Sequence, residues 1–160
     1  MIDDRPCGKV RRMRWMPHVT VAAVIEESGR FLMVEEHAEG RLVLNQPAGH
    51  LDDDESLTEA VSRETLEETG WQFRPTAITG IYRWRHPANG ETFVRVAFSG
   101  IHTDHDPDRS LDEGIVRALW LDRAELVAHQ ARHRSPMVLR CLDDYLSGAA
   151  YSLDILNDIL

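Results

Sequence analysis

Short runs of apolar, often β-branched residues alternate with turn-forming residues in the first third of the chain. Residues 18–25 are mostly apolar and lead into a turn at Gly29, which predicts a β-strand followed by a turn. Residues 30–35 then predict the second strand of a hairpin. Residues 42–44 predict a further strand, and the sequence Asn-Gln-Pro-Ala-Gly at 45–49 breaks the pattern.

Between residues 56 and 69 the apolar positions change from the spacing of a strand to that of a helix. Four apolar residues share one side of such a helix: Leu57, Ala60, Val61 and Leu66. Ser56 followed by Glu59 predicts a capping box at the helix start, and Gly70 stands where a C-cap glycine belongs. The pattern therefore predicts a helix between residues 56 and 70.

The rest of the chain mixes strands and helices without regular alternation. Residues 77–84 and 92–101 predict two strands around a turn at 87–90, and residues 119–121 predict a short strand. Helices are expected from Asp122 onward and over residues 136–146. The mixture indicates a layered α/β or α+β domain.

Length and composition fit one globular domain. The chain has 160 residues, of which 42% are hydrophobic and 28% charged, so it can bury a core. We expect an N-terminal extension at residues 1–15, a domain at 16–148 and a C-terminal tail at 149–160. No apolar run approaches about 20 residues, and no secretory core follows the basic first fifteen residues. A cytoplasmic protein with no membrane partner is the expectation.

Charge and cysteine usage narrow the possible partners. A net charge of −9 argues against binding to a nucleic-acid polymer, which requires a basic face. Small phosphorylated substrates remain compatible, because a divalent cation can reverse the sign of the local field. Cys7 and Cys141 lack the spacing of a zinc site, and they do not suggest a disulfide. Gly8-Lys9 lacks the flanking residues of a Walker-type phosphate loop.

Three glutamates gather near the end of the predicted helix. Glu64 and Glu68 are one turn apart on the same face, and Glu67 is their neighbour. The three carboxylates repel one another, and the C-terminal end of the helix dipole opposes them further. Arg63 supplies one positive charge, and a hard divalent cation such as Mg²⁺ or Mn²⁺ would supply the remainder. Taken alone, the cluster would be read as an ordinary solvated acidic face.

The surrounding residues turn that acidic face into a recognisable motif. The chain is similar to the Nudix box, G-x5-E-x7-R-E-U-x-E-E-x-G-U, in which U is a bulky apolar residue. All seven fixed positions match: Gly49, Glu55, Arg63, Glu64, Glu67, Glu68 and Gly70. A chance match of seven positions has a probability of about 10⁻⁹ per starting point. Thr65 departs from the motif at an apolar position, where we expect a small stability cost.

The resemblance extends beyond the box. Residues 17–22, 31–36, 45–51 and 93–95 are similar to those of the bacterial NudJ-type phosphatase subgroup of the Nudix hydrolases. This similarity covers roughly residues 16–148, nearly the whole predicted domain. The box is specific for the superfamily, and the flanking segments are less specific for the subgroup.

The resemblance implies a fold and a set of roles. The expected fold is an α/β/α sandwich around a mixed β-sheet. Glu64 and Glu68 would be the principal metal ligands, and Glu67 a further ligand or the base that activates water. The carbonyl group of Gly49 would contribute a backbone ligand. Arg63 would hold the glutamates in position, and Glu55 would support the loop.

Residues outside the box supply further candidates. Glu113, in a loop before the strand that contains Trp120, is a candidate fourth metal ligand or base, with a solvated turn acid as the alternative. Arg41 and Arg95 are candidate phosphate contacts, and Trp84 is a candidate surface on which a base stacks. Structural roles remain open for all three. The polar run at residues 102–110 is expected to be a loop.

The expected reaction is Mg²⁺-dependent hydrolysis of a diphosphate linkage by activated water. The substrates would be nucleoside di- or triphosphates or a related small diphosphate. The subgroup adds a pyrimidine diphosphate of thiamine biosynthesis, and a triphosphatase that removes modified nucleotides is a further alternative. A Nudix-fold sensor that binds nucleotide without turnover is an alternative of another class. The sequence leaves open whether the protein is a monomer or a homodimer.

Overall fold

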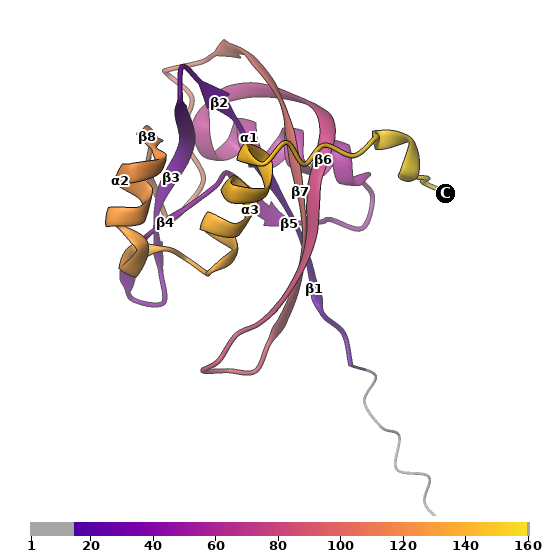
Figure 1. Ribbon diagram of the computed structural model, residues 1–160, viewed down its shortest axis with the longest axis horizontal. Coiled ribbons are helices and arrows are strands. Elements are labelled where there is room, and N and C mark those ends of the chain that lie inside the picture. Colours follow the sequence, from indigo (N-terminus) through magenta and orange to yellow (C-terminus); the bar gives the residue numbers. More distant parts are fainter. Residues whose placement is uncertain (1–14, 160) are drawn as a thin grey trace, which may run out of the picture.

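The computed structural model describes residues 15–159 (Figure 1). The strands are β1 (His18–Val24), β2 (Glu26–Glu27), β3 (Arg30–Ala38), β4 (Arg41–Asn45), β5 (Ala48–His50), β6 (Trp71–Arg85), β7 (Thr92–His105) and β8 (Ile115–Asp122). The helices are α1 (Leu57–Thr69), α2 (Arg123–Ala128) and α3 (Met137–Leu146), with 3₁₀ turns η1 (Gln130–Arg132) and η2 (Leu153–Ile155). Most of the predicted N-terminal extension, including Cys7, lies outside the described residues.

The strands form two four-stranded sheets. One sheet has the order β5-β1-β7-β6, in which β1 and β7 run parallel and the other pairs are antiparallel. The other sheet joins β2, β3 and β4, with β8 paired to β3 on its remaining side. The presence of both parallel and antiparallel pairs confirms the expected mixed sheet.

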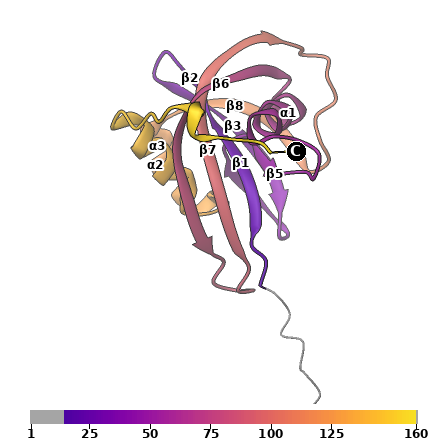
Figure 2. The ribbon, with the colours of Figure 1, turned by 90° about the vertical axis from the view of Figure 1, so that its right-hand side faces the viewer.

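Successive residues of the central strands face opposite helical layers, as the alternation of side chains along a strand requires. In β1, Val21 and Ala23 pack in one core cluster with Val61 of α1. Val24 packs in the other cluster with Leu126 of α2 and residues of α3. Figure 2 shows α1 on one side of the strands and α2 and α3 on the other. The expected α/β/α sandwich is therefore confirmed.

Several strands differ from the sequence-based expectation in length. The strand expected at 77–84 begins at Trp71, directly after α1, and the strand expected at 92–101 continues to His105. The expected loop at 102–110 is therefore wrong over residues 102–105. The ring of His105 stacks on Trp71 with centroids 4.4 Å apart, and the two residues pair in the β6–β7 ladder, so the extension of the strand depends on a partner that lies far away in sequence. The break at 45–49 also contains the start of a strand, β5.

The helix α1 carries the predicted caps. The Ser56 side chain accepts from the Glu59 backbone N–H, the Glu59 side chain accepts from the Ser56 backbone, and Gly70 adopts a left-handed conformation at the C-cap. The buried side differs from the prediction, because Thr65 is fully buried while Leu66 is only partly so. Thr65 Oγ1 donates to the carbonyl oxygen of Val61 at 2.7 Å, so its hydroxyl is satisfied inside the core.

The C-terminal segment packs on the sheet rather than standing apart from it. Tyr151 pairs with Ile78 of β6 as an isolated antiparallel bridge, and the two residues exchange backbone hydrogen bonds. Leu153 and Leu156 pack against the core cluster beneath α1. Among residues 15–159, no helix has the length and apolar character needed to cross a membrane.

Candidate active site

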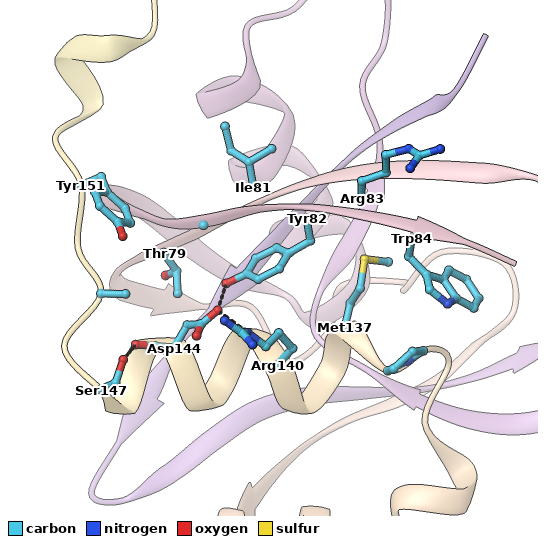
Figure 3. Close-up of a pocket in the computed structure, with 13 residues that line it drawn as sticks. Thr79, Ile81, Tyr82, Arg83, Trp84, Met137, Arg140, Asp144, Ser147 and Tyr151 are labelled. Carbon is cyan, nitrogen blue, oxygen red and sulfur yellow. Dashed lines mark hydrogen bonds and ion pairs between the residues drawn. The ribbon is translucent and has the colours of Figure 1, made fainter. Parts of the chain in front are cut away.

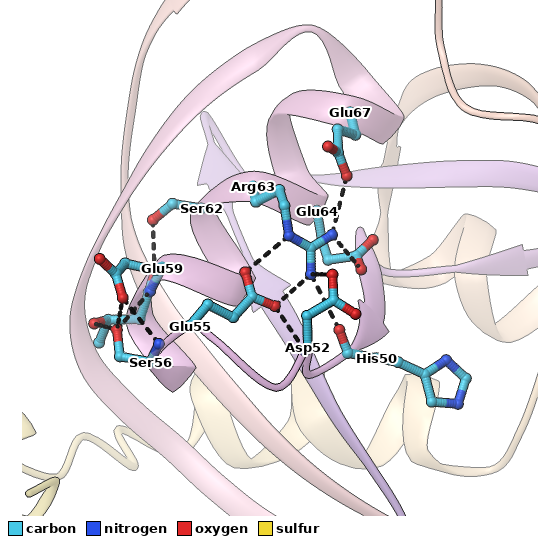
Figure 4. A network of polar contacts seen from close by, with 10 residues as sticks. His50, Asp52, Glu55, Ser56, Glu59, Ser62, Arg63, Glu64 and Glu67 are labelled. Carbon is cyan, nitrogen blue, oxygen red and sulfur yellow. Dashed lines mark hydrogen bonds and ion pairs between the residues drawn. The ribbon is translucent and has the colours of Figure 1, made fainter. Parts of the chain in front are cut away.

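Arg63 lies at the centre of a polar network that joins α1 to the loop before it (Figure 4). Its Nε donates to Glu55 Oε2 at 2.8 Å, and its Nη2 donates to Glu55 Oε1 at 2.5 Å. Its Nη1 donates to Glu64 Oε1 at 2.9 Å and to Glu67 Oε2 at 3.0 Å. The bond with Glu55 is the main cause that raises the pKa of Arg63, and it lowers the pKa of Glu55. One guanidinium thus orients three carboxylates.

Glu64, Glu67 and Asp112 form an acidic cluster in which one carboxylate oxygen of each residue lies within 4.8 Å of the others. Asp112 is held there because its backbone N–H donates to the carbonyl oxygen of Glu67 at 3.1 Å. Gly49 lies directly against the Glu64 carboxylate, since a Cβ at this position would lie 2.0 Å from Glu64 Cδ. The Glu64 carboxylate therefore occupies space that only a glycine at position 49 leaves open.

Glu68, which the sequence predicts as a principal metal ligand, is not one of the three acids whose oxygens lie within 4.8 Å of one another, and it is buried beside them. It is 8% exposed, and its Oε2 accepts from the backbone N–H of Ala48 at 2.8 Å. Burial raises the pKa of Glu68 well above 4.5, and the nearby charges of Glu36, Glu64 and Asp112 act in the same direction. Burial also raises the pKa of Glu64. Both carboxylates are destabilised as anions unless a cation lies close to them.

The loop before β8 contributes a different acid from the one that the sequence singled out. The structure brings Asp112 into the cluster, whereas Glu113 is not a member of it, although both residues are exposed. The two acids are adjacent, so their spacing from the box carries no information on which one joins the cluster. The bond between the Asp112 backbone and Glu67 makes that choice in the folded chain.

The donor set fits a hard divalent cation. All side-chain donors of the cluster are carboxylate oxygens, which are the ligands that Mg²⁺ and Mn²⁺ prefer in proteins. The acids outnumber the cations, since Arg63 is the only basic residue bonded to Glu64 and Glu67 within residues 15–159. The three heavy atoms nearest to a Cβ built at Gly49 all belong to the Glu64 carboxylate.

A pocket of about 220 Å³ opens beside Gly49. Arg95 and Trp84, two of the predicted substrate contacts, line it, and Arg41 lines a neighbouring hollow of about 530 Å³. Trp84 and Arg134 lie in the walls of both, so the two hollows adjoin, and together they are called the cleft. The structure thus places all three predicted substrate residues in the walls of this cleft.

Two buried side chains in the pocket each have one polar atom without a partner among the described residues. Arg95 is 5% exposed and donates only to the neutral oxygens of Asn45 and Gln46, at 3.3 to 3.4 Å, while its Nε has no partner among the described residues. Thr20 Oγ1 is likewise buried without a partner there. Burial lowers the pKa of Arg95. Such groups are expensive to bury unless a ligand satisfies them, which indicates that the pocket receives a polar molecule.

Sequence reasoning missed two residues of the cleft. Phe93 follows the turn between β6 and β7 and packs its ring 5.9 Å from that of Trp84. Arg134 stands between η1 and α3, and its backbone N–H donates to the carbonyl oxygen of Leu44 at 2.9 Å. Phe93 lies in the segment 93–95 that resembles the NudJ-type subgroup, but that resemblance gave it no role. No local motif marks Arg134, because it reaches the cleft through its contact with β4.

A larger hollow lies between β6 and α3 (Figure 3), with a volume of about 660 Å³. Its one acidic residue, Asp144, is bonded to Arg140 Nε at 2.8 Å and to the Tyr82 hydroxyl at 2.9 Å. This carboxylate is already neutralised, and the hollow is not lined by Gly49, the residue that lies against Glu64 of the acidic cluster. We therefore place the chemistry at the cluster beside Gly49.

Comparisons with known proteins agree with this geometry. The family model of the NUDIX domain matches residues 16–141. Phosphatase NudJ of Escherichia coli K12 is 38% identical over 142 residues, which are 89% of this chain and 92% of that protein. A NUDIX hydrolase from Nitrosomonas europaea is 52% identical, with a TM-score of 0.89 over 90% of this chain and 98% of the other.

A more distant structure shares the fold alone. The NUDIX domain of Shewanella oneidensis NrtR, in a cocrystal with ADP-ribose, is 15% identical and has a TM-score of 0.68 over 84% of this chain and 90% of that chain. The family model and the two nearer relatives cover most of the sequence, including the whole carboxylate network of α1. The chain therefore belongs to the Nudix hydrolase family, and it is a hydrolase.

Proposed function

We propose that this Nudix hydrolase cleaves the diphosphate linkage of nucleoside di- or triphosphates, or of a related small diphosphate, with Mg²⁺ as its metal and Mn²⁺ as a possible substitute. The observation that carries the proposal is the set of three carboxylates within 4.8 Å, two of them held by one guanidinium. Mg²⁺ at this position would neutralise phosphate oxygens and lower the pKa of a bound water.

Some residues of the site would bind the metal, and others would position those ligands. Glu64, Glu67, Glu68 and the Gly49 carbonyl are the proposed metal ligands, with Asp112 as an additional ligand from the loop before β8. Arg63 is a positioning residue, because its hydrogen bonds fix the carboxylates of Glu64 and Glu67.

Glu67 is the best candidate for the base that takes a proton from water. Glu68 is buried and one of its oxygens already accepts from Ala48, while Glu64 lies against Gly49. The Glu67 side chain is 28% exposed and commits one oxygen to Arg63, so its other oxygen is available to a water molecule. Asp112 is the second choice, and Glu113 remains the sequence-based alternative.

The cleft beside the cluster is the proposed binding site for the rest of the substrate. Trp84 and Phe93 offer ring faces for stacking, and Arg95 and Thr20 offer unsatisfied polar atoms. A volume of about 220 Å³ suits a single small ring, such as the pyrimidine of a thiamine precursor or of a nucleotide. This match in size supports a small diphosphate.

A substrate panel with Mg²⁺ tests the proposal directly. Nucleoside di- and triphosphates and small pyrimidine diphosphates are incubated with the protein, and release of phosphate is scored against release of pyrophosphate. Glu67→Gln should keep the fold and lower turnover by about 10²-fold or more. Glu59→Gln is the matched control, because it makes the same change on the same helix outside the cluster. Absence of turnover across the panel would favour the sensor.

A further inference from the structure

Three arginines of the cleft have no acidic partner. Within residues 15–159, neither Arg41, Arg95 nor Arg134 forms an ion pair, whereas six other arginines do: Arg30, Arg63, Arg117, Arg123, Arg132 and Arg140. The chain carries a net charge of −9, so acids are plentiful. Four other described arginines also lack ion pairs but line neither hollow: Arg74, Arg83, Arg85 and Arg109. The gathering of Arg41, Arg95 and Arg134 in one cleft, rather than the lack of ion pairs alone, therefore indicates a site for an anion.

The arginines follow the cleft away from the acidic cluster. The pocket of about 220 Å³ is lined by Gly49, Arg95 and Arg134. The hollow of about 530 Å³ shares Arg134 with that pocket and adds Arg41, but Gly49 and Arg95 do not line it. A molecule whose diphosphate lies at Gly49 would therefore meet Arg95 in the first pocket, Arg134 where the two hollows adjoin, and Arg41 in the second.

The backbone around Arg134 is fixed by contacts with β4. His133 forms an isolated bridge with Leu44, and Arg134 donates its backbone N–H to the carbonyl oxygen of Leu44 at 2.9 Å. The Gln46 side chain donates to the carbonyl oxygen of Val138 at 2.7 Å, which holds the next turn. The guanidinium of Arg134 is thus carried on an anchored segment, which reduces the entropy lost when it binds an anion.

The acids of the far hollow do not neutralise these arginines. Glu39 is the single acid in its walls, and its Oε1 lies 3.5 Å from His86 Nε2 rather than on an arginine. The walls therefore carry two permanent positive charges against one negative charge, with Gln130 beside them as a neutral donor. The local sign of charge is opposite to that of the whole protein.

We propose that Arg41 and Arg134 form an anion subsite at the end of the cleft remote from the carboxylates. The enzyme then selects diphosphates that carry a second phosphate group, away from the linkage that is cleaved. This inference rests on the proposed function for the position of the diphosphate.

Binding of mononucleotides tests the subsite without requiring hydrolysis. The probes are uridine 5′-monophosphate, uridine 2′,5′-bisphosphate and uridine 3′,5′-bisphosphate, which carry a single small ring and contain no diphosphate linkage. Isothermal titration calorimetry in millimolar Mg²⁺ should give at least one bisphosphate a Kd about tenfold or more below that of the monophosphate. The difference should shrink as salt is raised.

Substitutions of the arginines test whether the tighter binding of the bisphosphate depends on the proposed subsite. Arg134→Ala and Arg41→Ala should each reduce the ratio of the monophosphate Kd to the bisphosphate Kd. Arg41 lies outside the pocket beside Gly49, so Arg41→Ala should change the Kd of the monophosphate by less than about twofold. Arg134→Lys keeps the charge and should keep part of the preference. Arg74→Ala is the matched control, because Arg74 is exposed on β6 and lines neither part of the cleft.

The outcomes separate this inference from the proposed function. Equal Kd values for mono- and bisphosphates, no measurable binding of any probe, or a preference that survives the double variant Arg41→Ala/Arg134→Ala would each overturn the subsite. Turnover of diphosphates with equal Kd values would leave the proposed function standing and remove the subsite alone. A bisphosphate preference without turnover on the panel would support the subsite and contradict the proposed function.

Discussion

A methyl group added at position 49 should disable the site without unfolding the protein. In Gly49→Ala the new Cβ would lie 2.0 Å from Glu64 Cδ, whereas ordinary contact begins at 3.4 Å, so the carboxylate must retreat by about 1.4 Å. The obstacle is the end of a flexible side chain, and Gly49 has no positive φ that would strain an alanine. The carboxylate therefore moves and the backbone stays in place.

The consequence is a large loss of turnover with little loss of stability. A misplacement of about 1 Å at a catalytic group costs about 10²-fold in rate, so kcat should fall by at least that factor at saturating Mg²⁺. The alanine also removes freedom from the unfolded chain, which contributes about 0.4 to 1 kcal/mol in favour of folding. The Tm should consequently stay within about 4 °C of the parent value. Steady-state kinetics and thermal unfolding on the same preparation measure both.

A double-mutant cycle shows whether the effect passes through Glu64. Glu64→Ala alone should lose activity, and Gly49→Ala added to it should cause almost no further loss, because the clash is gone. Normal kcat in Gly49→Ala would refute the reasoning, as would a further loss of about tenfold in the Glu64→Ala background. A fall in Tm well beyond the stated range would show that the backbone, rather than the carboxylate, absorbs the methyl group.

Three further predictions concern the loop acid, the metal and a buried acid. Asp112→Asn should weaken Mg²⁺ binding by about tenfold in calorimetry, whereas Glu113→Gln should change it by less than about twofold, and the opposite ranking would restore the sequence-based choice. Mg²⁺ without substrate should raise the Tm, because it binds only the folded cluster and relieves carboxylate repulsion; no shift at millimolar Mg²⁺ would contradict a preformed site. Glu35 is 5% exposed and bonded to Arg132 and Arg117, which hold its pKa below 4.5. Its contribution to stability is therefore present above pH 4.5 and lost as the pH falls through the lowered pKa, so Glu35→Gln should cost about 2 kcal/mol in urea unfolding at neutral pH and less in acid.

Local spacing allowed the sequence to predict the parts of the site that one helix carries. Ser56, Glu59 and Gly70 set the ends of α1, because caps are made within a few residues of the chain. Once the helix is fixed, its period places Arg63 against Glu67 one turn later. The family, the fold class and the candidate carboxylates all followed from this segment and its flanks.

Tertiary structure decided everything that depends on pairing between distant segments. Asp112 rather than Glu113 meets the cluster because the loop before β8 docks on the Glu67 carbonyl oxygen, a contact that no spacing encodes. Arg134 enters the cleft because its backbone pairs with Leu44 of β4. The sequence alone determined the helix and its charges, since these arise from neighbours along the chain. The tertiary structure decided which residues from distant segments, such as Asp112 and Arg134, lie beside those charges. The free energy of long-range packing selects among loop residues that are locally equivalent.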